Sequence, residues 1–254
     1  MRQNQRDRNW ARLYVSSVRP NLAFDVDSLQ QEFIEFALAS KVLTFGEFKT
    51  KGGRLSPYFF NAGLFNQGAT LGRLATFYAQ TLLQARAQGR VEFDMLFGPA
   101  YKGITLAPAT AVALAGLGVD VPFAFNRKEA KDHGEGGVIV GSPLAGRVVI
   151  VDDVITDGAA KRESVELIRA HGARPVAVLI ALDRVERAAA IAGRDESLSS
   201  QSAVQAFEQE FGIPVISIAN FGDLMQFLDS DSPHARDARA FRSAMEQYRA
   251  KYAA

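Results

Sequence analysis

Cysteine is absent from all 254 residues, which removes several kinds of chemistry at once. Without a thiol the chain can form no disulfide, no thiolate nucleophile and no zinc site built on cysteine. A cysteine-free chain is compatible with a reducing compartment, and we expect this one to be in the cytoplasm.

Strong net charge and long apolar runs are also missing. The net charge is +1, which argues against wholesale binding to nucleic acid. No apolar run approaches the roughly 20 residues that a membrane-spanning helix needs, so we expect no membrane partner. The first twenty residues contain five arginines but no apolar segment of the secretory kind. We therefore expect a solvent-exposed, disordered tail over residues 1–27, with an arginine-rich transit peptide as the alternative.

Hydrophobic residues, in contrast, make up 48% of the chain, which is enough for a sizeable core. Short, wholly apolar segments alternate with amphipathic ones from residue 93 onward, a pattern typical of a parallel sheet covered by helices on both faces. We predict one α/β domain over residues 28–254. The predicted strands of its sheet are 93–97, 121–125, 147–151, 175–182 and 214–218. The polar, glycine-rich segment 127–137 is predicted to be a loop.

Two adjacent acids, Asp152 and Asp153, directly follow the predicted strand at 147–151, and a turn of small residues, 156–160, then opens a helix. Ligands of parallel sheets bind beyond the carboxyl ends of strands, and the free N–H groups of a helix N-terminus favour phosphate. Nearby carboxylates can accept hydrogen bonds from sugar hydroxyls or hold a metal through water. The arrangement predicts a site for a phosphorylated ribose. An ordinary turn whose acids cap the helix is the alternative.

The segment from Arg147 to Ser164 resembles the phosphoribosyl pyrophosphate motif of type I phosphoribosyltransferases. Three further segments resemble the orotate-specific branch of that family in order and spacing: Phe45–Phe65, Leu96–Gly103 and Phe125–Gly137. Four motifs in series make this resemblance far more specific than the acidic string alone.

The resemblance implies an α/β fold with a central, mostly parallel sheet flanked by helices. It also implies an N-terminal hood over about residues 28–68, a core over about 69–230 and a flexible catalytic loop. The implied activity is transfer of 5-phosphoribosyl from phosphoribosyl pyrophosphate to orotate, which gives orotidine 5′-monophosphate and pyrophosphate in de novo pyrimidine biosynthesis. Family members are homodimers in which this loop closes as a cationic lid over the neighbour's site.

The same resemblance assigns roles to individual residues. The residues implied in binding phosphoribosyl pyrophosphate are Lys51, Tyr101, Lys102, Arg127, Lys128, Lys131, His133, Asp152, Asp153, Val154, Ile155, Thr156, Asp157, Gly158, Ala159 and Ala160. Those implied in binding orotate are Phe59, Phe60, Thr156 and Arg184. The implied catalytic residues are Lys131, His133, Asp152 and Asp153. Mg²⁺ is the implied cofactor, held mainly by substrate and water rather than by a direct protein ligand.

Several of these roles have a structural alternative. The charged segment 127–137 could be a solvated loop, and Phe59 and Phe60 could simply belong to the core. Arg184 follows a predicted strand, where its planar fork suits a carboxylate, but it could instead form a salt bridge with Asp183 or Glu186.

The chain departs from the family's usual Thr-Ala-Gly-Thr-Ala loop at Asp157 and Ala159. Ala159 lacks a hydroxyl expected to bind the 5-phosphate, and Asp157 adds a negative charge, so we expect weaker donor binding rather than a different reaction. Two other functions stay open: transfer to a different base, and a non-catalytic regulator that senses phosphoribosyl pyrophosphate. The segment 51–65 and Arg184 disfavour the first. The second needs a DNA-binding surface, for which five arginines in a short tail are a weak basis, and the intact cationic lid favours catalysis.

Overall fold

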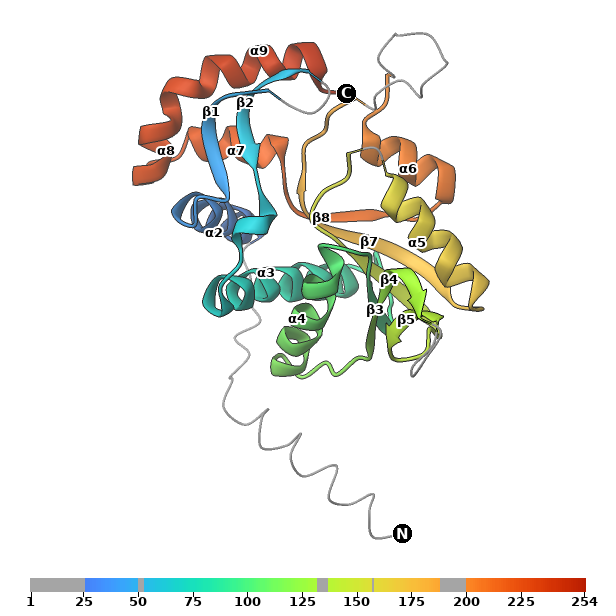
Figure 1. Cartoon of the computed structure of the whole chain (residues 1–254). Helices are drawn as coiled ribbons and strands as arrows, with labels where there is room; N and C mark the ends of the chain where they lie inside the picture. Colours follow the sequence, from blue (N-terminus) through green and yellow to red (C-terminus); the bar gives the residue numbers. More distant parts are fainter. Residues whose placement is uncertain (1–25, 50–52, 132–136, 157, 188–199) are drawn as a thin grey trace, which may run out of the picture.

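The computed structural model of the chain describes residues 26–49, 53–131, 137–156, 158–187 and 200–254 (Figure 1). Apart from its last two residues, the predicted tail lies outside the described residues, and so do Lys51, His133 and Asp157. In the ranges that are described, no helix is both long and apolar enough to cross a membrane.

A six-stranded sheet forms the centre of the structure, in the order β5-β4-β3-β6-β7-β8. All neighbouring strands in it are parallel except β4 and β5. Its strands are β3 (Met95–Gly98), β4 (Phe123–Lys131), β5 (Gly137–Gly141), β6 (Arg147–Val151), β7 (Arg174–Asp183) and β8 (Val215–Asn220). The predicted mostly parallel sheet is therefore confirmed.

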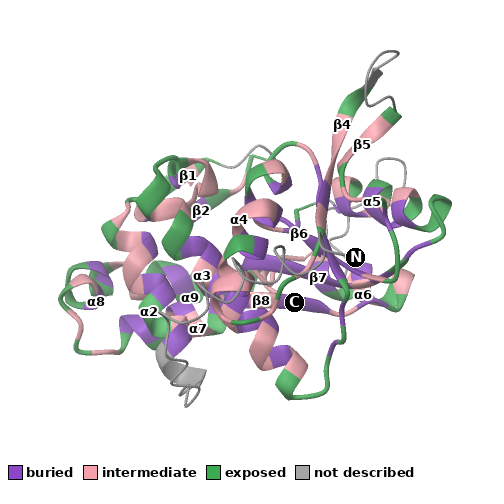
Figure 2. Ribbon diagram, turned by 90° about the horizontal axis from the view of Figure 1, so that it is seen from below, coloured by how far each residue is buried: buried purple, intermediate pink, exposed green. Residues whose placement is uncertain are grey.

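Helices cover both faces of this sheet, and successive side chains of each strand point alternately to one face and the other. Val149 and Leu179 belong to one hydrophobic cluster, which α3 (Gly68–Ala87), α4 (Gly103–Gly116) and α7 (Phe221–Leu228) also enter. Ile150 and Ile180, one residue further along the same strands, belong to a second cluster. This cluster contains residues of α5 (Ala159–Ala170) and α6 (Ala203–Phe211). Because successive strand residues face opposite sides, the wholly apolar runs in the sequence mark strands buried on both faces, as Figure 2 shows.

A separate antiparallel hairpin, β1 (Leu43–Lys49) and β2 (Leu55–Phe60), lies beside the sheet domain. It is joined to α3 by the short helix η2 (Ala62–Leu64). The N-terminal helix α2 (Val26–Ala39) and the C-terminal elements α8 (Pro233–Ala238), η3 (Arg239–Phe241) and α9 (Arg242–Tyr252) surround it (Figure 1). Aromatic rings join these parts: Phe33 of α2 contacts Phe60, and Phe45 stacks on Phe241 at 5.9 Å between centroids.

The loop predicted over residues 127–137 is partly wrong. β4 continues through Arg127 and Lys128 to Lys131, and β5 pairs with it antiparallel, with Asn126 opposite Ile139. The charged side chains masked this hairpin in the sequence, since strand formation at a sheet edge depends on backbone pairing more than on apolar content.

Two glycines allow β3 to meet α4 closely. A Cβ atom on Gly98 would lie 2.0 Å from the Gly103 carbonyl oxygen, and one on Gly103 would lie 2.5 Å from the Gly98 carbonyl carbon. Neither position has space for a methyl group, so the turn that carries Tyr101 and Lys102 depends on both glycines.

We therefore expect Gly98→Ala to lower the free energy of unfolding by about 2 kcal/mol or more through overpacking. The matched control is Gly72→Ala, at an exposed site inside α3 where a Cβ would meet no atom within 4 Å. This change should stabilise the protein by about 0.5–1 kcal/mol, since alanine favours helix more than glycine does. Urea unfolding of both variants measures the difference, and equal stability of the two would contradict the crowding.

Candidate functional site

The two acids lie where β6 ends, at the carboxyl edge of the sheet. The Asp152 N–H still donates to the Leu179 carbonyl at 3.0 Å, and the Asp153 carbonyl accepts from the Ala181 N–H at 2.8 Å. Tyr78 of α3 donates its hydroxyl to the Asp152 carbonyl at 2.7 Å. The backbone of the acidic pair is thus fixed by β7 on one side and by a buried tyrosine on the other.

The two carboxylates have different surroundings. Asp152 is buried and forms an ion pair of 2.5 Å with Lys161, and the two side chains are each 8% exposed. Burial raises the pKa of the Asp152 carboxyl, and Lys161 opposes that rise. Asp153 is only half-buried, and its Oδ1 accepts from the Val154 N–H at 2.8 Å. Of the two, Asp153 is therefore the more accessible to a ligand.

Lys161 is the main feature of this site that the sequence interpretation missed. Besides pairing with Asp152, its Nζ donates to the Val154 carbonyl at 2.6 Å, so one buried ammonium joins both ends of the acidic turn to α5. A signal was present in the sequence: Lys161 is four residues before Val165 and seven before Ile168, both buried on the inner face of α5. A lysine at an apolar position of an amphipathic helix indicates a buried cation.

The turn before α5 has the backbone shape of an anion-binding loop. Gly158 is the N-cap residue in the left-handed conformation, with φ of 73°. Its carbonyl accepts from the Lys161 and Arg162 N–H groups at 3.0 and 2.9 Å, which begins the helix. Ile155 is buried beneath the turn while Thr156 is exposed, so the loop has an apolar base and a polar rim. Ala159 and Ala160 form the first turn of α5, at the positive end of its dipole.

Cations from two neighbouring strands flank the same edge. Tyr101 and Lys102 are exposed in the turn after β3, and Lys128 of β4 lies over the Tyr101 ring at 5.9 Å. Asn126 holds these segments together by accepting from the Ala100 N–H at 2.8 Å. A Cβ built on Gly63 would lie 2.6 Å from the Lys102 Nζ, so Lys102 reaches across to η2. Arg127 lies on β4 beside Lys128, and Lys131 ends that strand.

Arg184 follows the end of β7 and is paired with Glu186. Its Nη2 lies 2.7 Å from the Glu186 carboxylate, and its Nε donates to the Tyr58 hydroxyl at 3.3 Å. Burial lowers the pKa of the Arg184 guanidinium, but the neighbouring Tyr58 and Glu186 outweigh it and leave that pKa above its usual value. The salt bridge with Glu186 considered from the sequence is therefore present. Tyr58, which the sequence interpretation passed over, is the aromatic residue that Arg184 contacts.

Phe59 and Phe60 point to opposite faces of β2, because neighbouring strand residues alternate. Phe60 is half-buried and packs toward Phe33, whereas Phe59 is 46% exposed and stacks on Phe48 at 5.5 Å. The hairpin thus turns the two rings away from each other, and a flat ligand can stack on only one of them.

Comparison with known proteins gives one consistent result. A model of the phosphoribosyl transferase domain matches residues 66–215. Orotate phosphoribosyltransferase of Herminiimonas arsenicoxydans is 62% identical over 227 residues, which cover 89% of this chain and 99% of that one. The Bordetella pertussis protein of the same name is 60% identical over 229 residues, covering 89% and 97%. The crystal structure of orotate phosphoribosyltransferase from Francisella tularensis is similar with a TM-score of 0.72 at 40% identity, covering 88% of this chain and all of that one.

The buried ion pair can be tested by a double-mutant cycle with Asp152→Asn and Lys161→Met. Lys161→Met alone should cost about 3–5 kcal/mol of unfolding free energy, because it leaves Asp152 buried without its partner. The double variant should cost less than the sum of the single variants by about 2 kcal/mol or more.

An exposed pair on the same helix is the matched control for this cycle. Arg169 and Glu166 lie 3.8 Å apart near the end of α5, and their coupling should be about 0.5 kcal/mol or less. Chemical unfolding provides all of these values. Coupling between Asp152 and Lys161 as small as that of the control pair would contradict the structural role of Lys161.

Proposed function

The chain belongs to the orotate phosphoribosyltransferases, and on that premise we propose that it transfers 5-phosphoribosyl from phosphoribosyl pyrophosphate to orotate at the carboxyl edge of its sheet. It has the type I phosphoribosyltransferase fold that the sequence predicts, and it is a pentosyltransferase. The observation that supports the location most strongly is the meeting of Asp152 and Asp153 with the α5 N-terminus at that edge. The products are orotidine 5′-monophosphate and pyrophosphate.

The sugar phosphate fits between the acids and the helix. The 5-phosphate is proposed to bind the loop from Thr156 to Ala160, where backbone N–H groups and the helix dipole favour an anion. Asp153, the more accessible acid, is placed to accept from a ribose hydroxyl. Asp152 lies next to it and is paired with the buried Lys161. A carboxylate near the ribose ring also stabilises the positive charge that develops on the sugar as the bond to pyrophosphate breaks.

The leaving pyrophosphate is proposed to meet the cations of the flanking strands. Tyr101, Lys102 and Lys128 lie on one side of the edge, and Arg127, Lys131 and His133 are assigned to the lid that closes over it. Pyrophosphate departs with the electron pair of its bond to the anomeric carbon, and the orotate ring nitrogen forms the new bond there and loses its proton. The cations stabilise the negative charge that develops on the pyrophosphate, and closure of the lid excludes water from the site.

Mg²⁺ is the proposed cofactor, and the acids present suit it. Mg²⁺ keeps several waters and binds through one or two carboxylates and substrate phosphates rather than through a protein cage. Among the described residues, no group of three or more histidines and acids forms such a cage. Asp153 is half-buried at the strand end and can hold one of the waters of a Mg²⁺–pyrophosphate complex. When bound, Mg²⁺ neutralises charge on the diphosphate.

Orotate recognition is assigned to Arg184 and Thr156 and to the Phe59–Phe60 segment, of which only one ring can stack on the base. Arg184 has five N–H donors, and its contacts with Glu186 and the Tyr58 hydroxyl use two of them. The others can bind the carboxylate that distinguishes orotate from uracil. The hairpin β1–β2 with α2 is proposed to act as the hood over this side, and Lys51, between the two strands, is proposed to contact the donor.

We expect the purified protein to consume orotate in the presence of phosphoribosyl pyrophosphate and Mg²⁺. The loss of orotate absorbance measures this reaction. Uracil and hypoxanthine, which lack the carboxylate, should react at least about 100-fold less efficiently, because the Arg184 N–H groups that do not bind Glu186 or Tyr58 would then have no carboxylate to bind. A preference for either of these bases would assign the chain to another substrate class. Omission of Mg²⁺ in the same assay tests the cofactor.

We further propose a cytoplasmic homodimer whose lids act on the neighbouring subunit. Lys131→Ala removes a lid cation, and Asp153→Asn removes a carboxylate of the ribose site, so each variant alone should have low turnover. In a mixed dimer, the Asp153→Asn subunit supplies an intact lid to the intact ribose site of its partner. Unfolding and refolding equal amounts together should restore about a quarter of the activity of refolded wild type, because half of the dimers then contain one complete site of two.

The control for this experiment is each variant refolded with itself under identical conditions. A mixture that stays as inactive as its two components would show that each lid serves its own subunit.

A further inference from the structure

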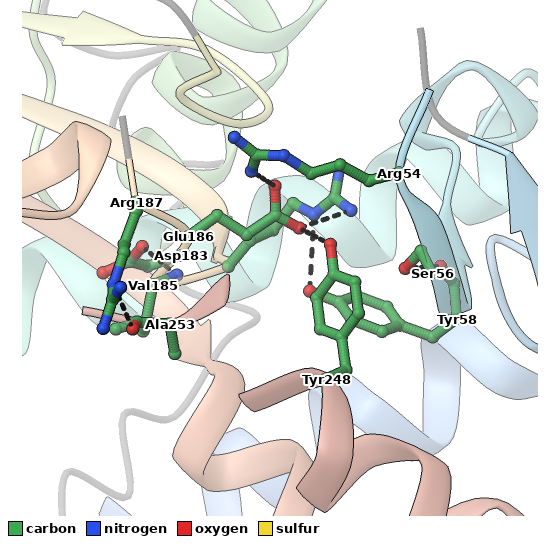
Figure 3. Close-up of polar contacts among 10 residues, drawn as sticks. Arg54, Ser56, Tyr58, Asp183, Val185, Glu186, Arg187, Tyr248 and Ala253 are labelled. Carbon is green, nitrogen blue, oxygen red and sulfur yellow. Dashed lines mark hydrogen bonds and ion pairs between the residues drawn. The ribbon is translucent and has the colours of Figure 1, made fainter. Parts of the chain in front are cut away.

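Glu186 is the centre of a polar cluster at the end of β7 (Figure 3). Its carboxylate lies 2.7 Å from Arg184 and 3.8 Å from Arg54, and it accepts from the Tyr248 hydroxyl at 2.6 Å. The side chains of Arg184 and Glu186 are 17% and 18% exposed, so water screens their attraction less than on an open surface. Three different parts of the chain therefore meet at one carboxylate: Arg54 just before β2, Arg184 at the end of β7 and Tyr248 of α9.

This cluster restricts how the Arg184 guanidinium can point. Glu186 holds Nη2 while the Tyr58 hydroxyl holds Nε, and the guanidinium lies over the Tyr58 ring at 5.3 Å from its centroid. Tyr58 is itself fully buried, so this platform is rigid. An arginine fixed in this way loses less conformational entropy when it binds a planar anion than a free one does.

Tyr248 connects this arrangement to the C-terminal helix. Burial, followed by the hydrogen bond to Glu186, raises the pKa of the Tyr248 hydroxyl to about 12, so it stays a donor throughout the neutral range. The Tyr248 ring also meets the Tyr58 ring edge-on at 6.2 Å. The backbone strengthens the same contact, because the Arg187 N–H donates to the Tyr252 carbonyl at 2.8 Å and the Ala254 N–H to the Val185 carbonyl at 3.1 Å.

Val185, between Arg184 and Glu186, shows that this short segment needs support. Its φ of 52° lies in the left-handed region, which is unfavourable for a β-branched residue. The Asp183 carboxylate accepts from the Val185 N–H at 2.8 Å, and the Ala254 N–H donates to its carbonyl. The end of β7 is thus held by its own Asp183 and by the C-terminal residue after α9, in a shape that directs Arg184 toward Tyr58.

We propose that Glu186 and Tyr248 are positioning residues for base selection: together they hold the Arg184 guanidinium in the orientation that binds the orotate carboxylate. The inference rests on the proposed role of Arg184. It gives the C-terminal helix, which lies outside residues 66–215, a part in substrate specificity. It also explains why the ion pair with Glu186 is compatible with ligand binding, since the pair orients the guanidinium and leaves N–H donors for a second anion.

Tyr248→Phe tests this directly, because it removes one hydroxyl and keeps the ring. The KM for orotate should rise about five- to tenfold, the loss expected for one hydrogen bond, while the KM for phosphoribosyl pyrophosphate stays unchanged. The efficiency ratio of orotate to uracil should fall by a similar factor, since uracil has no carboxylate for Arg184. Glu186→Gln, which keeps the shape but removes the charge, should shift the same two quantities at least as far.

Tyr252→Phe is the matched control, one turn further along α9 in a ring that packs against Tyr248 at 5.0 Å. It should leave both KM values and the base ratio as in the wild type. Equal behaviour of the Tyr248 and Tyr252 variants, or an equal rise of both KM values in the Tyr248 variant, would overturn the inference.

Arg184→Met in the same assay separates this inference from the function on which it rests. A large rise in the orotate KM for Arg184→Met with none for Tyr248→Phe and Glu186→Gln refutes only the positioning role. An unchanged orotate KM for Arg184→Met refutes the role of Arg184 and the inference with it. Failure of the wild type to consume orotate refutes the proposed function itself.

Discussion

The parallel direction of five strands is the constraint on which the rest of the structure depends. Because β3, β4, β6 and β7 run the same way, whatever follows each of them arrives at one edge. The acids after β6, the cations after β3 and along β4, and the arginine after β7 share that edge, although Lys102 and Arg184 are 82 residues apart in the chain. Burial on both faces fixes the register of the strands, and the register fixes the relative positions of these groups.

Much of this arrangement is readable from the sequence, for a physical reason. The apolar runs that end in Asp152 and in Asp183 predict buried strands and where they stop, and the small residues after Asp153 predict the turn into a helix. The hairpin of β4 and β5 was not predictable in this way. Charged residues interrupt the apolar pattern in the second half of β4, so the backbone pairing that extends this strand beside β5 has no hydrophobic period to reveal it.

Interactions between distant segments were the other part that the sequence did not reveal. The helical pattern can indicate that Lys161 is buried, but its partner Asp152 is identified only when α5 is placed on the sheet. The sequence favours a ligand contact for Arg184 with a salt bridge as the alternative, and the structure shows a salt bridge with Glu186. Tyr248 has no motif of its own, since its importance comes only from the docking of α9 against the end of β7.

The facing glycines at the β3–α4 junction have a consequence for the history of the chain. Gly98 and Gly103 each occupy the space that a side chain on the other would require, and both are already the smallest residue. A mutation at one of them cannot be compensated by shrinking the other. Substitution is therefore blocked at both positions at once, whereas Tyr101 and Lys102, which lie between them and are exposed, are free of this restriction.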